Sequence, residues 1–160
     1  MQTAGHIFQI NASDGGVPKR GVTTAVVDKL GLEGDKQADK THHGGPQRAL
    51  CLYSLERILA LQAEGHPIYP GSTGENLTIA GLDWAQVLPG ARLRLGNDVT
   101  VTITSYAAPC RTIRASFQEE QFKRISQKTH PGWARAYACV ERGGALRIGD
   151  PVILEAADGR

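Results

Sequence analysis

The stretch Pro89–Tyr106, PGARLRLGNDVTVTITSY, carries the strongest β-strand signal in the sequence. Apolar and polar residues alternate through Arg92-Leu93-Arg94-Leu95 and again through residues 99–104, and Gly96-Asn97-Asp98 separates the two runs. Alternation with a period of two is typical of strands, and a short Gly- and Asn-containing segment between two such runs is typical of a tight turn. The stretch therefore predicts two antiparallel strands joined as a hairpin.

Shorter extended segments lie on both sides of this hairpin. We expect strands at residues 5–12, 23–27, 49–53, 75–79, 134–140 and 145–155, with Gly- and Pro-containing turns between them. Ser54 is a candidate N-cap for the clearest helix, and Gly65 is its expected stop. After Cys110, one face of a broken helix is predicted by Ile113, Phe117, Phe122 and Ile125. Many short strands and two helical stretches predict an all-β, mainly antiparallel barrel or sandwich.

Composition narrows the class of protein. A length of 160 residues predicts one domain, residues 1–160, and a net charge of +2 with scattered Lys and Arg argues against a nucleic-acid partner. There is neither a secretion signal at Met1 nor an apolar run of the ~20 residues needed to cross a bilayer, so no membrane partner is expected. An odd number of widely spaced cysteines predicts reduced thiols in the cytoplasm: Cys51, Cys110 and Cys139.

Cys110 is the leading candidate for chemistry because of its position and its neighbours. It follows Pro109 after the long alternating strand, so we expect it at a strand-to-helix junction near a helix N-terminus. Backbone N–H groups there, together with Arg111 and Arg114, favour the thiolate, which binds metals and attacks electrophiles. The alternative is a small, buried apolar side chain.

A Gly-rich segment, His42-His43-Gly44-Gly45-x-x-Arg48, is the second candidate, with Asp35-Lys36 upstream of it. Paired glycines let backbone N–H groups approach an anion, and an Arg that follows can bind phosphate or carboxylate. Neighbouring histidines on a strand point to opposite faces, so both can bind one ion only from a loop. Without a Cys-x-x-Cys or His-x-x-x-His partner, solvated loop histidines are the simpler interpretation.

The segment 71–77, GSTGENL, is similar to a phosphate-binding loop but lacks the Gly-Lys-Ser/Thr ending, so nucleotide hydrolysis is not expected. Turn geometry also explains its glycines and Asn76. Glu75 is alternatively a structural acceptor for neighbouring backbone groups or for Arg48.

Three other positions have both a functional and a structural interpretation. Cys51 and Cys139 lie in apolar strands and are expected to be buried and unreactive. Trp133 and Arg135 either wall a ring-shaped ligand or form a core tryptophan with a solvated arginine.

Five segments then follow one another along the chain: Gly31-Leu32-Glu33-Gly34-Asp35, His43-Gly44-Gly45-x-x-Arg48-Ala49, Gly74-Glu75-Asn76-Leu77-Thr78, Pro109-Cys110-Arg111 and Gly143-Gly144-x-x-Arg147-x-Gly149-Asp150. In this order they resemble the MOSC family, the domain type of molybdenum cofactor sulfurase C-termini. The resemblance covers nearly the whole chain. It implies a closed, mainly antiparallel β-barrel with a few short peripheral helices.

The resemblance also implies a cofactor. In molybdenum-binding relatives the thiol that Cys110 matches is a metal ligand or is thought to carry sulfur. A thiolate is a suitable soft ligand for molybdenum, and a pterin phosphate needs basic side chains and free N–H groups. The residues implied as catalytic are Cys110, which is also the metal ligand, Asp35 and Glu75. Those implied to bind molybdenum cofactor (molybdopterin) are Lys36, His43, Gly44, Gly45, Arg48, Asn76 and Arg111.

The implied activity is the reduction of a small N-hydroxylated substrate, such as a hydroxylaminopurine or an amidoxime. Without a Cys-rich iron–sulfur segment, electrons are expected from a separate reductase. The additional N-terminal subdomain of larger relatives is not expected here. The alternatives are a carrier of the cofactor, a carrier of sulfur as a Cys110 persulfide, and a metal-free domain of the same fold. Pyridoxal phosphate is linked to the family through a neighbouring domain, and no lysine context here supports a Schiff base. Oligomeric state is left open.

Overall fold

The predicted hairpin forms one wall of the structure, a computed structural model that describes residues 4–35 and 45–155. Strand β7 (Arg92–Leu95) pairs antiparallel with β8 (Val99–Ala107), with Leu93 opposite Val101, and both side chains are fully buried. Gly96 lies in the turn at φ 62°, a conformation that glycine adopts without steric penalty. The alternation seen in the sequence therefore directs one set of apolar side chains into the core.

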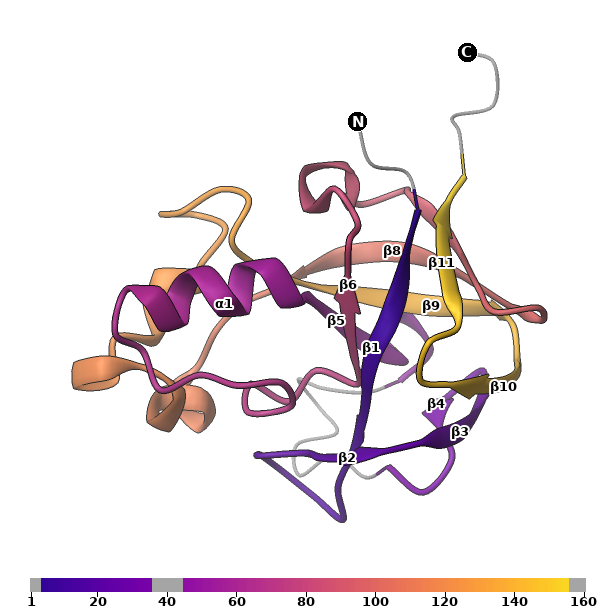
Figure 1. Cartoon of the computed structure of the whole chain (residues 1–160), viewed down its shortest axis with the longest axis horizontal. Helices are drawn as coiled ribbons and strands as arrows, with labels where there is room; N and C mark the ends of the chain where they lie inside the picture. The colour runs from indigo at the N-terminus through magenta and orange to yellow at the C-terminus, as the bar shows by residue number, and fades with distance from the viewer. Residues whose placement is uncertain (1–3, 36–44, 156–160) are drawn as a thin grey trace.

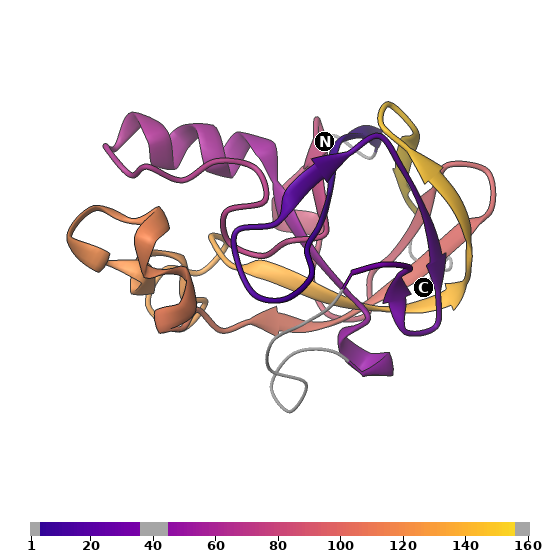
Figure 2. The same cartoon turned by 90° about the horizontal axis from the view of Figure 1, so that it is seen from below.

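Seven strands close into a barrel, in the order β11-β7-β8-β9-β5-β6-β1, and a pairing of β1 with β11 completes it (Figures 1 and 2). The remaining barrel strands are β1 (Ala4–Ala12), β5 (Leu50–Ser54), β6 (Leu77–Ala80), β9 (Arg135–Arg142) and β11 (Pro151–Leu154). Strand β2 (Arg20–Val22) extends the sheet beyond β1. A separate three-stranded sheet contains β3 (Thr24–Asp28), β4 (Gly31–Leu32) and β10 (Gly144–Arg147). The all-β, mainly antiparallel closed barrel is confirmed.

One barrel pair departs from the antiparallel pattern. Strands β5 and β6 run parallel, with Leu52 opposite Leu77. A parallel pair requires a long crossover connection, and the connection here contains α1 (Leu55–Ala63). The predicted N-cap is confirmed, because Ser54 Oγ accepts a hydrogen bond from the Arg57 backbone N–H at 3.1 Å. The crossover places α1 on the outside of the barrel.

The predicted broken helix after Cys110 consists of three short 3₁₀ turns: η3 (Arg111–Ser116), η4 (Gln118–Glu120) and η5 (Phe122–Ile125). Glu119 and Glu120 have positive φ angles of 52° and 56°, which interrupt the helical path. Ile113 is buried against the core with Phe117 and Ile125. Figures 1 and 2 place this segment and α1 together at one side of the barrel. Two further 3₁₀ turns are η1 (Pro46–Arg48) and η2 (Trp84–Gln86).

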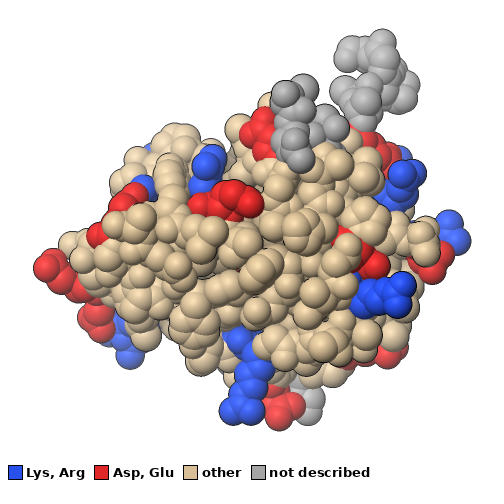
Figure 3. Space-filling model, in the orientation of Figure 1, with Lys and Arg blue, Asp and Glu red and all other residues tan. Residues whose placement is uncertain are grey.

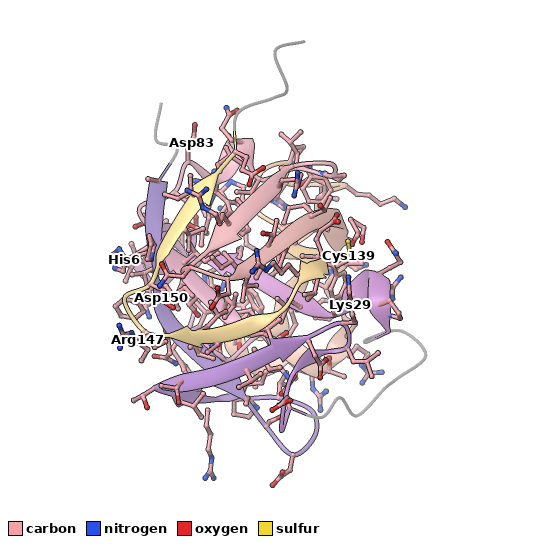
Figure 4. All side chains as sticks on the ribbon, turned by 90° about the vertical axis from the view of Figure 1, so that its right-hand side faces the viewer. His6, Lys29, Asp83, Cys139, Arg147 and Asp150 are labelled. Carbon is pink, nitrogen blue, oxygen red and sulfur yellow. The ribbon has the colours of Figure 1, made fainter. Side chains whose placement is uncertain are left out.

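The last family-like segment connects the two sheets. Asp150 Oδ2 accepts a hydrogen bond from the Arg147 backbone N–H at 3.0 Å, and Gly149 lies between them at φ 92°. The Gly149 N–H donates to Ile7 O at 2.8 Å, which attaches the turn to β1. Figure 4 shows Arg147 and Asp150 at this turn. The predicted strand region 145–155 is thus divided between β10 and β11, and its Gly149-Asp150 pair has a structural role.

The surface shown in Figure 3 carries separated basic and acidic side chains with wide neutral areas between them. Among residues 4–35 and 45–155, no helix is long and apolar enough to cross a membrane.

Candidate functional site

The outer faces of β5, β8 and β9 carry a side-chain cluster that is separate from the barrel core. The strand register places Cys51 opposite Tyr137, and Ala107 opposite Arg135. Cys51, Ala107 and Tyr137 pack together as their own buried group. Because side chains alternate along a strand, Arg135 lies on the same face of β9 as Tyr137. A thiol, a phenol and a guanidinium therefore share one side of the sheet. We call Cys51, Tyr137 and Arg135 the outer cluster.

Cys110 lies just beyond the end of β8, at the N-cap of η3, and is half-buried. Its Sγ is 2.8 Å from Thr112 Oγ1. The predicted strand-to-helix junction is confirmed, but the helix is a six-residue 3₁₀ segment. Arg114 donates to Arg111 O at 2.9 Å and lies 3.4 Å from the Glu120 carboxylate, so an acidic side chain partly offsets its charge.

Arg135 is buried, which corrects the interpretation of this residue as a solvated arginine. Its side chain is only 4% exposed, and Nη1 donates to Thr73 O at 2.7 Å. Nη2 reaches Ala108 O at 3.4 Å, and Nε is buried with no hydrogen-bond partner among the described residues. These bonds connect the loop before β6 to the turn that leads into Cys110. A single guanidinium therefore spans two segments that are distant in sequence.

The outer cluster holds two weak acids in their neutral forms. Burial raises the pKa of the Cys51 thiol to about 11, and Arg135 opposes this rise. Burial also raises the pKa of the Tyr137 hydroxyl to about 12, and the nearby Cys51 and Cys110 side chains contribute to this. Both groups are thus protonated at neutral pH. Neither contributes negative charge beside Arg135.

We predict that ionisation of the Cys51 thiol lowers the free energy of unfolding at alkaline pH. In the unfolded chain the thiol titrates near its ordinary pKa of 9.0, whereas in the folded state it titrates near 11. The contribution of the protonated thiol to the free energy of unfolding is therefore complete below pH 9 and is lost as pH rises to about 11. The total loss is about 2–3 kcal/mol. Urea unfolding measured across this pH range should show the loss in the wild type, with a shallower slope in Cys51→Ala. The slope should be unchanged in Cys139→Ala, and equal slopes in all three proteins would contradict the prediction.

Arg48 contacts the same cluster from the Gly-rich segment. Its guanidinium carbon lies 5.3 Å from the centre of the Tyr137 ring, within the range of a cation–π contact. Gly45 precedes η1 at φ 79°, and its carbonyl accepts from the Arg48 backbone N–H at 3.0 Å. Both residues are exposed, so this edge of the cluster faces solvent. Lys36, His43 and Gly44, which were expected to bind cofactor with them, lie outside the described residues.

Asp35 belongs to a buried polar network at the barrel rim. Its carboxylate lies 2.6 Å and 2.8 Å from Lys19 Nζ, and these two side chains are only 4% and 5% exposed, respectively. Asp35 also accepts from the Ser13 backbone N–H at 3.0 Å and from Asn76 Nδ2 at 2.9 Å. Asn76 Oδ1 accepts from the Cys51 N–H at 2.9 Å, and the Asn76 N–H donates to Cys51 O at 2.7 Å. Hydrogen bonds thus connect Lys19 with the outer cluster.

Glu75 is fully buried and its carboxylate is well bonded. It accepts from the Gly71 backbone N–H at 3.0 Å, from Thr73 Oγ1 at 2.7 Å and from Thr78 Oγ1 at 3.1 Å. The alternative interpretation, that Glu75 is a structural acceptor for neighbouring backbone groups, agrees with the Gly71 contact. No hydrogen bond or ion pair joins Glu75 to Arg135 within the described part of the chain.

The structure brings together Cys110, Arg48 and the Asp35–Asn76 network around the outer cluster, whereas exposed Arg111 projects from η3. Sequence reasoning missed Lys19 and Tyr137. Lys19 is one lysine in a Gly- and Pro-containing turn, and Tyr137 follows an alanine in an apolar strand, so neither had a distinguishing local pattern. Within residues 4–35 and 45–155, no three His, Cys, Asp or Glu side chains form a group that could hold a metal.

The structure also decides the expectations for Cys139, which was predicted to be buried, and for Trp133. Cys139 is partly exposed, and Figure 4 shows it on the outer side of β9. Trp133 is partly buried and packs against the core, as one interpretation predicted, and its ring also contacts Arg57 at 4.8 Å and Arg124 at 4.2 Å.

Comparison with known proteins identifies the family. A family model described as the MOSC domain matches residues 39–153, which include most of the barrel and Cys110. The chain belongs to the MOSC domain family. Protein YiiM of Escherichia coli (strain K12) is 31% identical over 146 residues, which cover 82% of this MOSC chain and 64% of YiiM. A protein named "Reductase" from Gibberella moniliformis is 30% identical over 129 residues, 78% of this chain and 22% of that protein.

The solved structure of Escherichia coli YiiM superposes with a TM-score of 0.71 at 24% identity, covering 95% of this MOSC chain and 70% of YiiM. At this identity the superposition shows the shared fold. In the sequence comparison, the matched part of this chain spans 64% of the full length of YiiM, which is less than two thirds.

Proposed function

We propose that this MOSC protein binds molybdenum cofactor through Cys110 and reduces small N-hydroxylated compounds, with electrons from a separate reductase in the cytoplasm. The observation that carries the proposal is a half-exposed Cys110 thiol two residues after Ala108, whose carbonyl is contacted by the buried, incompletely bonded guanidinium of Arg135. Membership of the MOSC family and the name "Reductase" of a relative support the redox assignment.

The residues present fit the cofactor in chemical type. The Cys110 thiol supplies a soft sulfur ligand for molybdenum. Exposed Arg48 and Arg111, with the backbone N–H of Gly45, offer the donors that a pterin phosphate requires. Lys36, His43 and Gly44 complete the proposed binding set. When bound, the cofactor supplies the two-electron chemistry by which an N–OH group is converted to N–H and water, with two protons taken up.

The protein's own contribution in this proposal is to position these groups. Asn76 uses its side-chain amide on Asp35 and Cys51, so it fixes β5 against the barrel rim. Asp35 and Glu75 were expected to be catalytic, and their enclosed carboxylates support positioning roles instead. Neutral Cys51 and Tyr137 add no negative charge beside Arg135 at pH 7.

The test is to express wild-type protein, Cys110→Ala and Cys139→Ala in a host that makes molybdenum cofactor. We expect bound molybdenum and pterin in the wild type, retention in Cys139→Ala and loss of most of the molybdenum in Cys110→Ala. Cys139→Ala is a matched control because it removes a partly exposed thiol outside the cluster formed by Cys51, Ala107 and Tyr137. Equal, near-zero molybdenum in all three proteins would overturn the proposal.

Turnover separates an enzyme from a carrier. Wild-type protein that retains molybdenum should reduce a hydroxylaminopurine when an electron-donating reductase is added. Metal retention without turnover would instead support a cofactor carrier. The sulfur-carrier alternative predicts a persulfide that maps to Cys110, and labelling elsewhere would exclude it.

A further inference from the structure

We propose that Arg135 forms an oxyanion-binding subsite beside Cys110, which takes a phosphate-class group through its unbonded Nε and its weakly bonded Nη2. The inference deepens the proposed function, because it assigns the anionic part of the ligand to a residue outside the Gly-rich segment. The class of ligand follows from the geometry of arginine, whose planar guanidinium donates two parallel hydrogen bonds to phosphate or carboxylate.

The first argument is that Arg135 is a buried cation without a direct anionic partner among the described residues. The guanidinium is 4% exposed and makes no ion pair among the described residues. A buried charge is strongly unfavourable unless opposite charge or hydrogen bonds compensate it. The nearby Glu75 uses its carboxylate oxygens on Gly71, Thr73 and Thr78, and Asp35 is paired with Lys19. The Glu75 carboxylate keeps its negative charge and offsets part of the Arg135 charge from a distance. It forms no direct pair with the guanidinium, so an anionic group of the ligand would supply the missing contact.

The second argument is the unused donor capacity. Nε is buried with no partner within residues 4–35 and 45–155, whereas Nη1 has a good bond of 2.7 Å to Thr73 O. The Nη2 contact with Ala108 O at 3.4 Å is longer than the usual 2.7–3.2 Å, so an incoming oxyanion can replace it at little cost. Ala108 is exposed and Cys110 is half-buried. A ligand can therefore approach from the Ala108–Cys110 turn.

The third argument is the sign of the surroundings. The Cys51 thiol and the Tyr137 phenol lie on the same face as Arg135, and both remain neutral at pH 7. Arg48 lies over the Tyr137 ring and adds positive charge at the solvent side. On this face the charged groups are thus two arginines, which favour an anion at the solvent side.

The test uses inorganic phosphate on cofactor-free wild-type protein, Arg135→Gln, Arg135→Lys and Arg94→Gln. Arg94 is the control because it is an exposed arginine on β7, across β8 from β9. Calorimetry should show saturable binding to the wild type and to Arg94→Gln. The dissociation constant of Arg135→Gln should rise about tenfold or more, because charge-assisted bonds are lost, with a smaller rise in Arg135→Lys. Equal affinity in wild type and Arg135→Gln overturns the proposal.

A second measurement tests the proposal in the wild-type protein, in case Arg135→Gln fails to fold. The ¹⁵N–¹H resonance of an Arg Nε reports its hydrogen bonding, so the Arg135 signal in the wild type should shift as phosphate is added. The missing signal in Arg135→Lys assigns it. No saturable shift in the wild type overturns the proposal without any need for Arg135→Gln.

The source of the anion is identified by the pterin content of protein made with the cofactor present. Loss of both pterin and phosphate binding in Arg135→Gln assigns the subsite to the cofactor phosphate. Retained pterin with lost phosphate binding assigns it to an anionic substrate or to free phosphate. The experiment separates failure of the subsite from failure of the proposed function. If the protein binds phosphate through Arg135 but holds no molybdenum, only the proposed function is overturned.

Discussion

The variant Asp35→Asn is expected to lower the free energy of unfolding by about 3–5 kcal/mol, the usual cost of leaving one member of a buried ion pair unpaired. Asp35 holds Lys19 Nζ at 2.6 Å and 2.8 Å, and both side chains are almost fully enclosed. Asparagine retains one acceptor oxygen but not the negative charge, so the ammonium remains in a site with little water. Chemical denaturation of purified protein measures the loss.

Two controls identify charge burial as the cause. The double variant Lys19→Met/Asp35→Asn removes both charges and keeps an acceptor oxygen for the Ser13 N–H or Asn76, so it should be more stable than Asp35→Asn alone. Arg92→Ala breaks the exposed pair with Glu155 at 3.6 Å and should change stability by less than about 1 kcal/mol. A change of similarly small size in Asp35→Asn would show that the network adapts without the carboxylate.

Replacement of Glu75 by Gln is expected to destabilise the protein by about 3 kcal/mol, since it removes acceptors from a fully buried site. The carboxylate accepts from Gly71, Thr73 and Thr78, whereas an amide has one acceptor oxygen and presents an NH₂ group to the remaining donors. The variant also removes a negative charge near Arg135. Thermal or urea unfolding measures the effect.

Glu33→Gln is the matched control for Glu75→Gln, because Glu33 is exposed on the surface. Its effect should lie within about 0.5 kcal/mol of zero. If Glu75→Gln unfolds like the control but reduces turnover, the carboxylate is catalytic and its bracing contacts are secondary. The same comparison decides the role of Asp35. The pair of variants therefore separates positioning from catalysis at both acidic residues.

Local patterns predicted the parts of the fold that depend on neighbouring residues. The alternation across Gly96 predicted β7 and β8, and Ser54 predicted the start of α1 because a cap requires only the next few residues. The parallel pairing of β5 with β6 depends on a crossover and on register, which no short segment encodes.

The candidate site shows the same division. Cys110 was found because Pro109 and the end of a strand mark its position. Arg135 was not recognised as buried, because its enclosure depends on Thr73 and Ala108, which are remote in sequence. The pairing of Lys19 with Asp35 likewise joins two turns that only the folded barrel brings together.

The closing contact of the barrel joins β1 to β11, with Ala4 opposite Ile153. During translation, β1 is made before the other described strands, and its pairing with β11 can form only after all of them have been made. Until then, β1 and β7 each have an unpaired edge, which other nascent chains can use as a template for sheet extension. Synthesis of β11 therefore both completes the fold and ends the period in which this chain is most exposed to misassembly.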